Sequence, residues 1–138
     1  MSELHIVFGT GPLGRWTAEA LIKMGKSVRM VNRSGKMDNP PAGVEIVASD
    51  AYDAARNIQT TKNAAAIHQC AQPHYYEWPE KFPPLQKAIL EAAGVNGAKL
   101  IVGDNLYMYG HFTGSLREDF PIQPNTKKGR VRDRKSVV

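Results

Sequence analysis

A glycine-rich turn directly after the first apolar segment is the feature that most constrains the fold of this chain. Residues 4–8 form a short apolar run, which leads into Gly-Thr-Gly-Pro-Leu-Gly at residues 9–14 and then into an amphipathic stretch over residues 15–25. A strand, a G-x-G-x-x-G turn and a helix in this order are typical of the fingerprint that binds the pyrophosphate of a dinucleotide. The alternative interpretation is a glycine-rich surface turn.

Each position of the turn has its own expected role. Gly9 lets the chain leave the strand sharply, Gly11 lets a pyrophosphate approach the backbone, and Gly14 lets the helix pack closely against the strand. Pro12 suits the first helical turn, where no N–H group is needed. The exposed N–H groups and the helix dipole then hold the anion. The candidate pyrophosphate-binding residues are Gly9, Thr10, Gly11, Pro12, Leu13 and Gly14.

The end of the second expected strand, residues 27–32, bears on which cofactor is bound. An NAD site usually carries Asp or Glu here to bind the ribose 2′-OH. This chain instead has Asn32, Arg33 and Ser34, with Lys36 close behind. A guanidinium group and a hydroxyl suit a 2′-phosphate. We therefore expect NADP, with NAD also possible; a solvated basic turn is the alternative.

The rest of the chain continues an alternation of strands and helices, which predicts parallel βαβ units with right-handed crossovers. Further strands are expected at residues 44–48, 64–70 and 99–103, and helices at residues 52–61 and from Pro83 to Ala93. The predicted fold is an α/β, doubly wound parallel sheet (Rossmann) with five strands in the order 3-2-1-4-5, truncated before any later strands. Asp50, just after the third strand, is placed to accept a hydrogen bond from adenine or to cap a helix.

Five segments resemble, in order, the short-chain dehydrogenase/reductase superfamily, specifically its extended and atypical NAD-dependent epimerase/dehydratase branch. They are the turn 9–14, the pair Asp50-Ala51, and the segments 68–72, 105–110 and 117–121. The resemblance extends from Glu3 to about Arg132. It implies that the glycine turn binds pyrophosphate and that Arg33 and Ser34 bind the adenosine phosphate. It also implies that Asp50 and Ala51 contact adenine and that Gln69, Cys70 and Ala71 line the nicotinamide ribose.

The catalytic positions depart from this family pattern. Typical members carry Ser or Thr after the fifth strand, and later a Tyr followed four residues on by a Lys. Counting from Tyr109, the hydroxyl position falls on Asn105, and the Tyr and Lys positions fall on Lys128 and Arg132. Asn can still polarise a carbonyl, but Lys and Arg cannot reproduce a tyrosine acid. Tyr107 or Tyr109 is a possible substitute, and packing near the sheet edge is the alternative role for both.

Other catalytic chemistry has little support in the sequence. Cys70 is the only cysteine, and its apolar surroundings favour a buried residue over a nucleophile. The four histidines show no metal-ligand spacing, so no metal site is expected. Residues 73–79 are aromatic and polar and follow the fourth strand, where either substrate contact or simple loop packing is expected.

Composition and charge favour a soluble, cytoplasmic domain that acts on a small molecule. The 138 residues are enough for one core, and neither a signal peptide nor a membrane span is visible. The last twelve residues hold six of the 18 basic residues and one of the 13 acidic ones, so the remainder is neutral. Because the net charge of +5 belongs to this tail, nucleic acid is not an expected partner.

The C-terminal segment divides into two parts. Residues 127–132 are expected to start a helix and to end an incomplete NAD(P)-binding domain over residues 1–132. Residues 133–138 (Asp-Arg-Lys-Ser-Val-Val) have no apolar periodicity, and one reading frame of a common short-read sequencing adapter encodes the same six residues. We therefore expect a non-native tail on the front half of a longer reductase; a natural short protein with a basic tail is the alternative.

Three interpretations of function remain open. The first is the NAD(P)-binding part of an NADP-dependent reductase, epimerase or dehydratase that acts on a sugar or small carbonyl compound. The second is a non-catalytic NADP(H)-binding redox sensor, which the altered Tyr and Lys positions favour. The third, for this chain itself, is an inactive fragment of either.

Overall fold

The computed structural model describes residues 2–136, with side chains described as far as Asp133, and divides the chain into two compact units. The first unit comprises the residues up to Gln72 together with Lys87–Gly103, and the second comprises Pro73–Gln86 and the residues from Asp104 onward. Helix α3 (Trp78–Asn96) contributes its first half to the second unit and its second half to the first.

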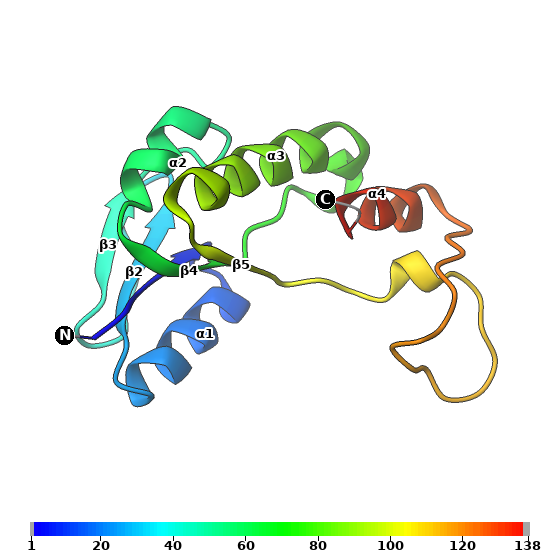
Figure 1. Ribbon diagram of the computed structural model, residues 1–138, viewed down its shortest axis with the longest axis horizontal. Helices are drawn as coiled ribbons and strands as arrows, with labels where there is room; N and C mark the ends of the chain where they lie inside the picture. The colour runs from blue at the N-terminus through cyan, green and yellow to red at the C-terminus, as the bar shows by residue number, and fades with distance from the viewer. Residues whose placement is uncertain (1, 137–138) are drawn as a thin grey trace. The chain divides into compact units, whose positions relative to one another are not determined.

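The first unit is built on a parallel sheet, visible in Figure 1. Its strands are β1 (Leu4–Phe8), β2 (Ser27–Asn32), β3 (Glu45–Ala48), β4 (Ala64–Gln69) and β5 (Lys99–Val102). They lie in the order β3-β2-β1-β4-β5, and every neighbouring pair is parallel, which confirms the predicted fold class and strand order. Phe8 is in register with Val31 on one side and Gln69 on the other, so three strands end together at one edge.

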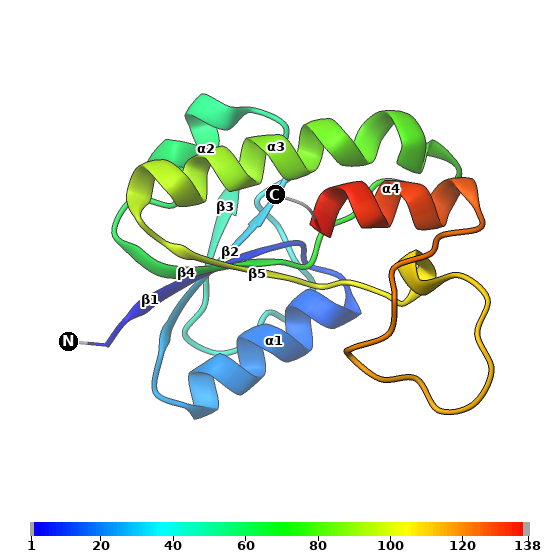
Figure 2. The ribbon, with the colours of Figure 1, turned by 45° about the vertical axis from the view of Figure 1, so that its right-hand side comes forward.

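Helices cover both faces of this sheet. Figure 2 shows α1 (Pro12–Lys23) on one face and α2 (Ala54–Thr60) and α3 on the other. Because the central strand is covered on both sides, Ile6, Val7 and Phe8 are all buried, although alternate residues of a strand point to opposite faces. The turn after β1 is therefore attached to a central strand whose last three residues are buried.

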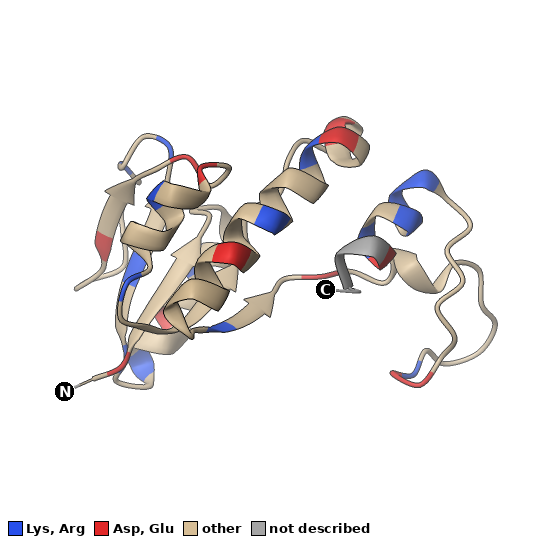
Figure 3. Ribbon diagram, turned by 45° about the horizontal axis from the view of Figure 1, so that its top comes forward, with Lys and Arg blue, Asp and Glu red and all other residues tan. Residues whose placement is uncertain are grey.

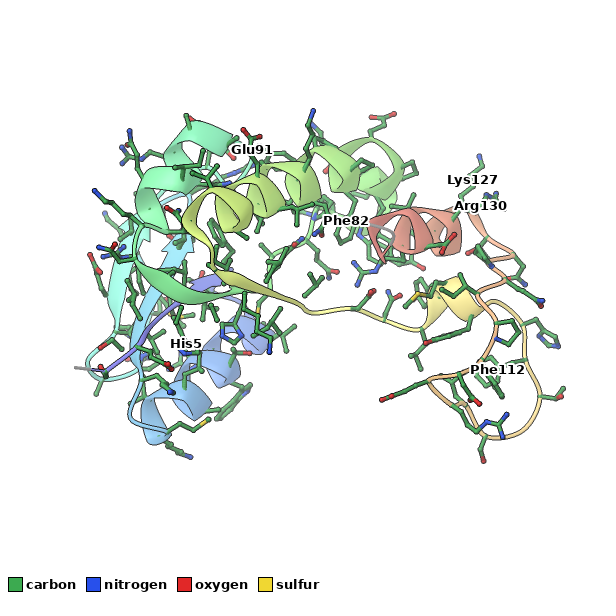
Figure 4. The ribbon with its side chains drawn as sticks, viewed as in Figure 1. His5, Phe82, Glu91, Phe112, Lys127 and Arg130 are labelled. Carbon is green, nitrogen blue, oxygen red and sulfur yellow. The ribbon has the colours of Figure 1, made fainter. Side chains whose placement is uncertain are left out.

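The second unit consists of helices and a long loop over residues 110–126. It contains the short 3₁₀ turns η1 (Tyr75–Glu77) and η2 (Tyr107–Tyr109), the first half of α3, and α4 (Lys127–Ser136). Trp78, Phe82 and Val131 form its buried apolar cluster, and the side chain of Phe82 is labelled in Figure 4. Basic residues are concentrated on α4 (Figure 3).

The strand positions agree with prediction to within one residue, but the predicted start of α3 at Pro83 is wrong. The helix begins five residues earlier, at Trp78. Pro83 and Pro84 each remove a backbone N–H donor inside the helix, which would normally favour a break. Here Trp78 and Phe82 bury their rings in the second unit, and this packing holds the first turns helical.

The predicted helix start at residues 127–132 is confirmed by α4, which continues to Ser136. The last two residues of the predicted tail lie outside the described residues. The non-native character of residues 133–138, and the extent of one domain over residues 1–132, stay predictions. Within residues 2–136, no helix is long and apolar enough to cross a membrane.

Candidate cofactor-binding site

The turn between β1 and α1 requires glycine at its first position. Gly9 has φ of +108°, a conformation that side chains with a Cβ rarely adopt. A Cβ added to Gly9 would also lie 2.9 Å from the backbone of Cys70 and Ala71, which follow β4. The Gly9 N–H donates a hydrogen bond to the Val31 carbonyl of β2 at 3.0 Å. The turn is therefore held tightly between the ends of three strands.

The other two glycines of the turn have contrasting surroundings. A Cβ on Gly14 would collide with the backbone of Gly9, so α1 packs directly against the turn. A Cβ on Gly11 would meet no atom within 4 Å, so the space beside its backbone is open. Close packing at Gly14 and open space at Gly11 are what the fingerprint requires for helix packing and for approach of a pyrophosphate.

The first turn of α1 has the features of an anion site. Gly11 is its N-cap residue and provides no side-chain cap, and Pro12 occupies the first helical position. No acidic residue lies in this first turn. N–H groups at a helix start have no partner within the helix, and the helix dipole adds partial positive charge there. A phosphate fits both the space and the charge at this position.

At the end of β2, Asn32 lies next to this turn and organises the loop that follows. Its amide nitrogen donates to the Thr10 hydroxyl at 3.0 Å and to the Lys36 carbonyl at 2.7 Å. Its amide oxygen accepts the Gly35 N–H at 2.6 Å. The sequence proposed Asn32 and Thr10 as separate cofactor contacts, and it contained no direct sign that they bond to each other across 22 positions.

Arg33 and Ser34 lie on the exposed surface of the same loop. The Ser34 hydroxyl accepts the Lys36 N–H at 3.2 Å, which holds the loop in a compact turn. Among the described residues, no ion pair includes Arg33 or Lys36, in contrast to Arg29, whose guanidinium pairs with Glu45 at 2.6 Å. The two cations are therefore available to a negatively charged group.

Asp50 and Ala51 follow β3 at the same edge of the sheet. The Asp50 carboxylate accepts the Tyr52 N–H at 3.0 Å, and the Ala51 carbonyl accepts a bond from the Asn57 side chain at 2.6 Å. The alternative role of Asp50 as the cap of α2 is wrong, because Asp53 is the N-cap residue and accepts the Arg56 N–H at 3.0 Å.

Gln69, Cys70 and Ala71 lie at the end of β4, directly beside Gly9. The side chain of Gln69 is 2 % exposed, and neither its amide oxygen nor its nitrogen has a hydrogen-bond partner among the described residues. Such a buried polar group normally has a partner. Burial raises the pKa of the Cys70 thiol, which packs near Thr17, so the neutral form is favoured over the nucleophilic thiolate.

The residues at the expected catalytic positions all lie in the second unit, where they make structural contacts. The Asn105 side chain accepts the Tyr107 N–H at 3.1 Å. The Lys128 ammonium lies 4.0 Å from the centre of the Tyr75 ring. Arg132 is 2 % exposed, lies 4.8 and 4.5 Å from the ring centres of Trp78 and Phe82, and pairs with Asp104 at 3.1 Å.

Tyr107, a possible substitute for the missing tyrosine, has a raised pKa. A hydrogen bond with Tyr75 is the main cause, and the nearby cations Lys128 and Arg132 act in the opposite direction. Its phenol therefore stays protonated at neutral pH and is unsuited to act as a phenolate base. Of the aromatic residues in the segment 73–79, Trp78 at the start of α3 is buried and therefore packs, while Tyr75 and Tyr76 of η1 are exposed; ligand contact by the two tyrosines stays a prediction.

Two histidines that the sequence did not connect lie together in the first unit. His5 of β1 and His68 of β4 stack with their ring centres 5.3 Å apart, and a hydrogen bond of 3.0 Å joins Nδ1 of His5 to Nε2 of His68 (Figure 4 labels His5). Burial, followed by the effect of His5, lowers the pKa of His68. The part of the chain that the structure describes contains no group of three or more His, Cys, Asp or Glu residues suited to a metal ion.

Comparison with solved structures identifies enzymes with the same fold. Uronate dehydrogenase from Agrobacterium tumefaciens has a TM-score of 0.80 and 20% identity, covering 99% of this chain and 54% of that one. UDP-glucose 4-epimerase from Thermotoga maritima, solved with UDP-glucose, has a TM-score of 0.81 and 17% identity, covering 97% and 49% of the two chains. UDP-glucose 4-epimerase from Brucella ovis, solved in complex with NAD, has a TM-score of 0.82 and 19% identity, covering 99% and 46%.

These similarities confirm the predicted Rossmann fold, and the enzymes include the epimerase class that the sequence resembles. The chain spans about half the length of the structures it matches. No protein-family model and no curated protein sequence matches it.

Proposed function

We propose that the first unit binds a nicotinamide dinucleotide and that the chain is the NAD(P)-binding part of a short-chain reductase of the extended or atypical epimerase/dehydratase type. The geometry of the glycine turn carries this proposal. Gly9 and Gly14 are closed in by backbone atoms, while Gly11 faces open space at an uncapped helix start.

We infer a preference for NADP over NAD. The strand β2 ends in Asn32 and not in a carboxylate, so the usual acceptor for a ribose 2′-OH is replaced. Arg33 offers a guanidinium fork beside the Ser34 hydroxyl, and this pair suits a doubly charged phosphate. Asp50 and Ala51, which follow β3, would then contact the adenine ring.

The proposed enzyme acts on a sugar or small carbonyl compound in the cytoplasm. The cofactor would supply the hydride chemistry when bound. Gln69, Cys70 and Ala71 would orient the nicotinamide ribose, and Asn105 would polarise a substrate carbonyl. Lys128 would contribute a positive charge, since it cannot replace a tyrosine acid at neutral pH.

A non-catalytic NADP(H) sensor is the second candidate, and the environment of Arg132 favours it. The guanidinium is enclosed by Trp78 and Phe82 and paired with Asp104. Burial lowers its pKa, while Asp104 and Tyr107 counteract this effect, and a guanidinium does not release its proton in proteins. Arg132 is thus suited to holding the second unit together, and not to proton transfer. The 138-residue chain by itself would then be an inactive part of either protein.

Binding of NADPH and NADH to the 138-residue chain tests the cofactor assignment. We expect NADPH to bind more tightly in calorimetry and to give the larger thermal shift. Arg33→Ala should reduce NADPH affinity about tenfold or more, since a charge-assisted hydrogen bond contributes about 1.5–3 kcal/mol, and should leave NADH affinity unchanged. Arg56→Ala on α2 removes the same charge elsewhere and is the matched control. Equal affinities in the wild type reject the NADP preference, and absence of binding rejects the site.

An activity measurement on a version of the protein that continues naturally beyond Arg132 separates enzyme from sensor. Oxidation of NADPH by a carbonyl compound, or conversion of a sugar without net NADPH consumption (epimerisation or dehydration, followed by product analysis), with a loss in Lys128→Ala, supports the enzyme. Intact NADPH binding without turnover supports the sensor. The gene sequence after Arg132 also tests the non-native tail: a genomic stop codon after Val138, without adapter sequence, rejects it.

A further inference from the structure

The amide of Asn32 uses its hydrogen-bonding groups within the protein. Both of its N–H donors are engaged, one by the Thr10 hydroxyl and one by the Lys36 carbonyl. Its oxygen accepts the Gly35 N–H at 2.6 Å, a short bond. A side-chain amide has two donors and one acceptor oxygen. Asn32 therefore has no free donor for a phosphate, which is the group that a residue at this strand end would be expected to offer to NADP.

The partners of Asn32 belong to two different loops. Thr10 lies inside the glycine turn, between Gly9 and Gly11, whereas Gly35 and Lys36 belong to the loop after β2. The amide thus links the turn assigned to the pyrophosphate with the loop that carries Arg33 and Ser34. A second link lies further along the same loop, where the Arg15 guanidinium of α1 donates to the Asp38 and Asn39 carbonyls, but among the described residues Asn32 is the side chain that bonds to both the glycine turn and residues 33–36.

The loop has little freedom apart from this link. Gly35 has φ of +69°, and a Cβ there would lie 2.9 Å from the Ala48 side chain of β3. The main chain of Asn32 is also fixed, because its carbonyl accepts the Ser49 N–H at 2.8 Å. Since residues 33–36 are themselves held firmly, the Asn32 amide is the side-chain contact that fixes this part of the loop, with its exposed Arg33 and Ser34, against the glycine turn.

We propose that Asn32 is a positioning residue, which determines selectivity for the 2′-phosphate by coupling the glycine turn to residues 33–36, without itself contacting the cofactor. This inference rests on the proposed dinucleotide function. Pyrophosphate and 2′-phosphate belong to one ligand, so their two binding loops must be held at a matching separation. Without the amide link, each loop keeps its own charged and polar groups, but the distance and orientation between the two loops are no longer fixed.

The coupling is tested by the ratio of NADPH to NADH affinity, measured by calorimetry on the 138-residue chain. We expect Asn32→Ala to lower this ratio about tenfold, which corresponds to about 1.4 kcal/mol. Thr10→Val, which removes the acceptor hydroxyl, should lower it about threefold, and Thr10→Ser, which keeps the hydroxyl, should retain the wild-type ratio. The double variant Asn32→Ala/Thr10→Val should show no further loss beyond Asn32→Ala, because both changes break one link.

Asn96 provides a matched control. Its amide nitrogen also donates to a backbone carbonyl, that of Ile58 at 2.9 Å, and to a threonine hydroxyl, that of Thr61 at 2.8 Å. Asn96→Ala should therefore cost comparable stability and leave the cofactor ratio unchanged. If Asn32→Ala does not fold, the contrast between Thr10→Val and Thr10→Ser decides the matter by itself.

The outcomes separate this inference from the proposed function. A wild-type chain that binds neither dinucleotide, or binds both equally, overturns the proposed NADP site and the coupling with it. A wild-type chain that prefers NADPH, with Asn32→Ala retaining that preference or with additive effects at Thr10 and Asn32, overturns the coupling alone. A change in ratio in Asn96→Ala of the same size also overturns it.

Discussion

Gly9 and Gly11 stand two positions apart in the same turn, yet the structure makes different demands on them. Gly9 combines a positive φ with backbone atoms where a Cβ would lie, whereas Gly11 has φ of −75° and open space. Gly9→Ala should lower the free energy of unfolding by at least about 2 kcal/mol, through strain and collision. Gly11→Ala should change it by less than about 0.5 kcal/mol but weaken dinucleotide binding.

Urea unfolding and calorimetry on the two variants measure these effects. The contrast between the two variants matters more than either value: Gly9→Ala should mainly lower stability, and Gly11→Ala should mainly weaken ligand binding. Unchanged dinucleotide affinity in Gly11→Ala would show that the pyrophosphate does not approach this part of the backbone.

The histidine pair makes the stability of the first unit depend on pH. The pKa of His68 is lowered in the folded protein, below its ordinary value of 6.5, by burial and then by His5. The unfolded chain therefore binds the proton more readily, so the stabilisation is complete above about pH 6.5 and is lost as the pH falls toward the folded-state pKa. His68→Gln should reduce the drop in Tm between pH 7.5 and pH 5.5.

An exposed histidine serves as the control for this effect. His111→Gln lies in the second unit and should leave the slope of Tm against pH as in the wild type. If His68→Gln shows the same slope of Tm against pH as the wild type, the histidine pair is excluded as the cause of the pH dependence.

At the scale of elements, α2 illustrates how short-range chemistry sets a helix boundary. The Asp53 carboxylate caps the helix through the Arg56 N–H, whereas the Asp50 carboxylate accepts the Tyr52 N–H in the preceding turn. Asp53→Ala should lower the free energy of unfolding by about 1 kcal/mol, the usual value for an N-cap. Asp50→Ala should cost less than Asp53→Ala and should instead weaken binding of the adenine end of the cofactor. Thermal unfolding and calorimetry on both variants check the two assignments, and the reverse order of stability would contradict them.

The start of α3 shows the opposite case, in which local signals mislead. Two consecutive prolines at positions 83 and 84 are typical of a helix start, and the prediction followed them. The helix begins at Trp78 because burial of two aromatic rings against Val131 outweighs the missing N–H donors. Val131 lies 53 positions after Trp78, so no pattern within the helix itself contains this information.

At the scale of the whole molecule, the first unit exposes apolar side chains on the face that carries α1. Trp16 on that helix is 64% exposed, and Ile101 in the edge strand β5 is 40% exposed. Exposed apolar surface and open strand edges favour association. Replacing Trp16 with Gln should change the free energy of unfolding by less than about 0.5 kcal/mol, since the ring makes few buried contacts, and should reduce aggregation.

Light scattering during heating measures that aggregation, and urea unfolding measures the stability. Leu21→Gln, on the buried side of the same helix, is the contrasting variant and should destabilise by several kcal/mol. Equal aggregation of Trp16→Gln and the wild type would place the associating surface elsewhere.

The sequence by itself determined the strand positions to within a residue and the glycine turn, because these follow from local periodicity and turn chemistry. It also determined the five-strand order, because alternating strands and helices that open on this turn restrict the topology to the doubly wound sheet. Only the tertiary structure decided that Asn32 bonds to Thr10, that His5 meets His68, and that Arg132 is enclosed by Trp78 and Phe82. Each of these contacts joins residues distant in the chain, and which of them meet depends on strand register and helix packing. The physical reason is that local preferences specify elements, whereas burial and hydrogen-bond satisfaction specify which side chains are brought together.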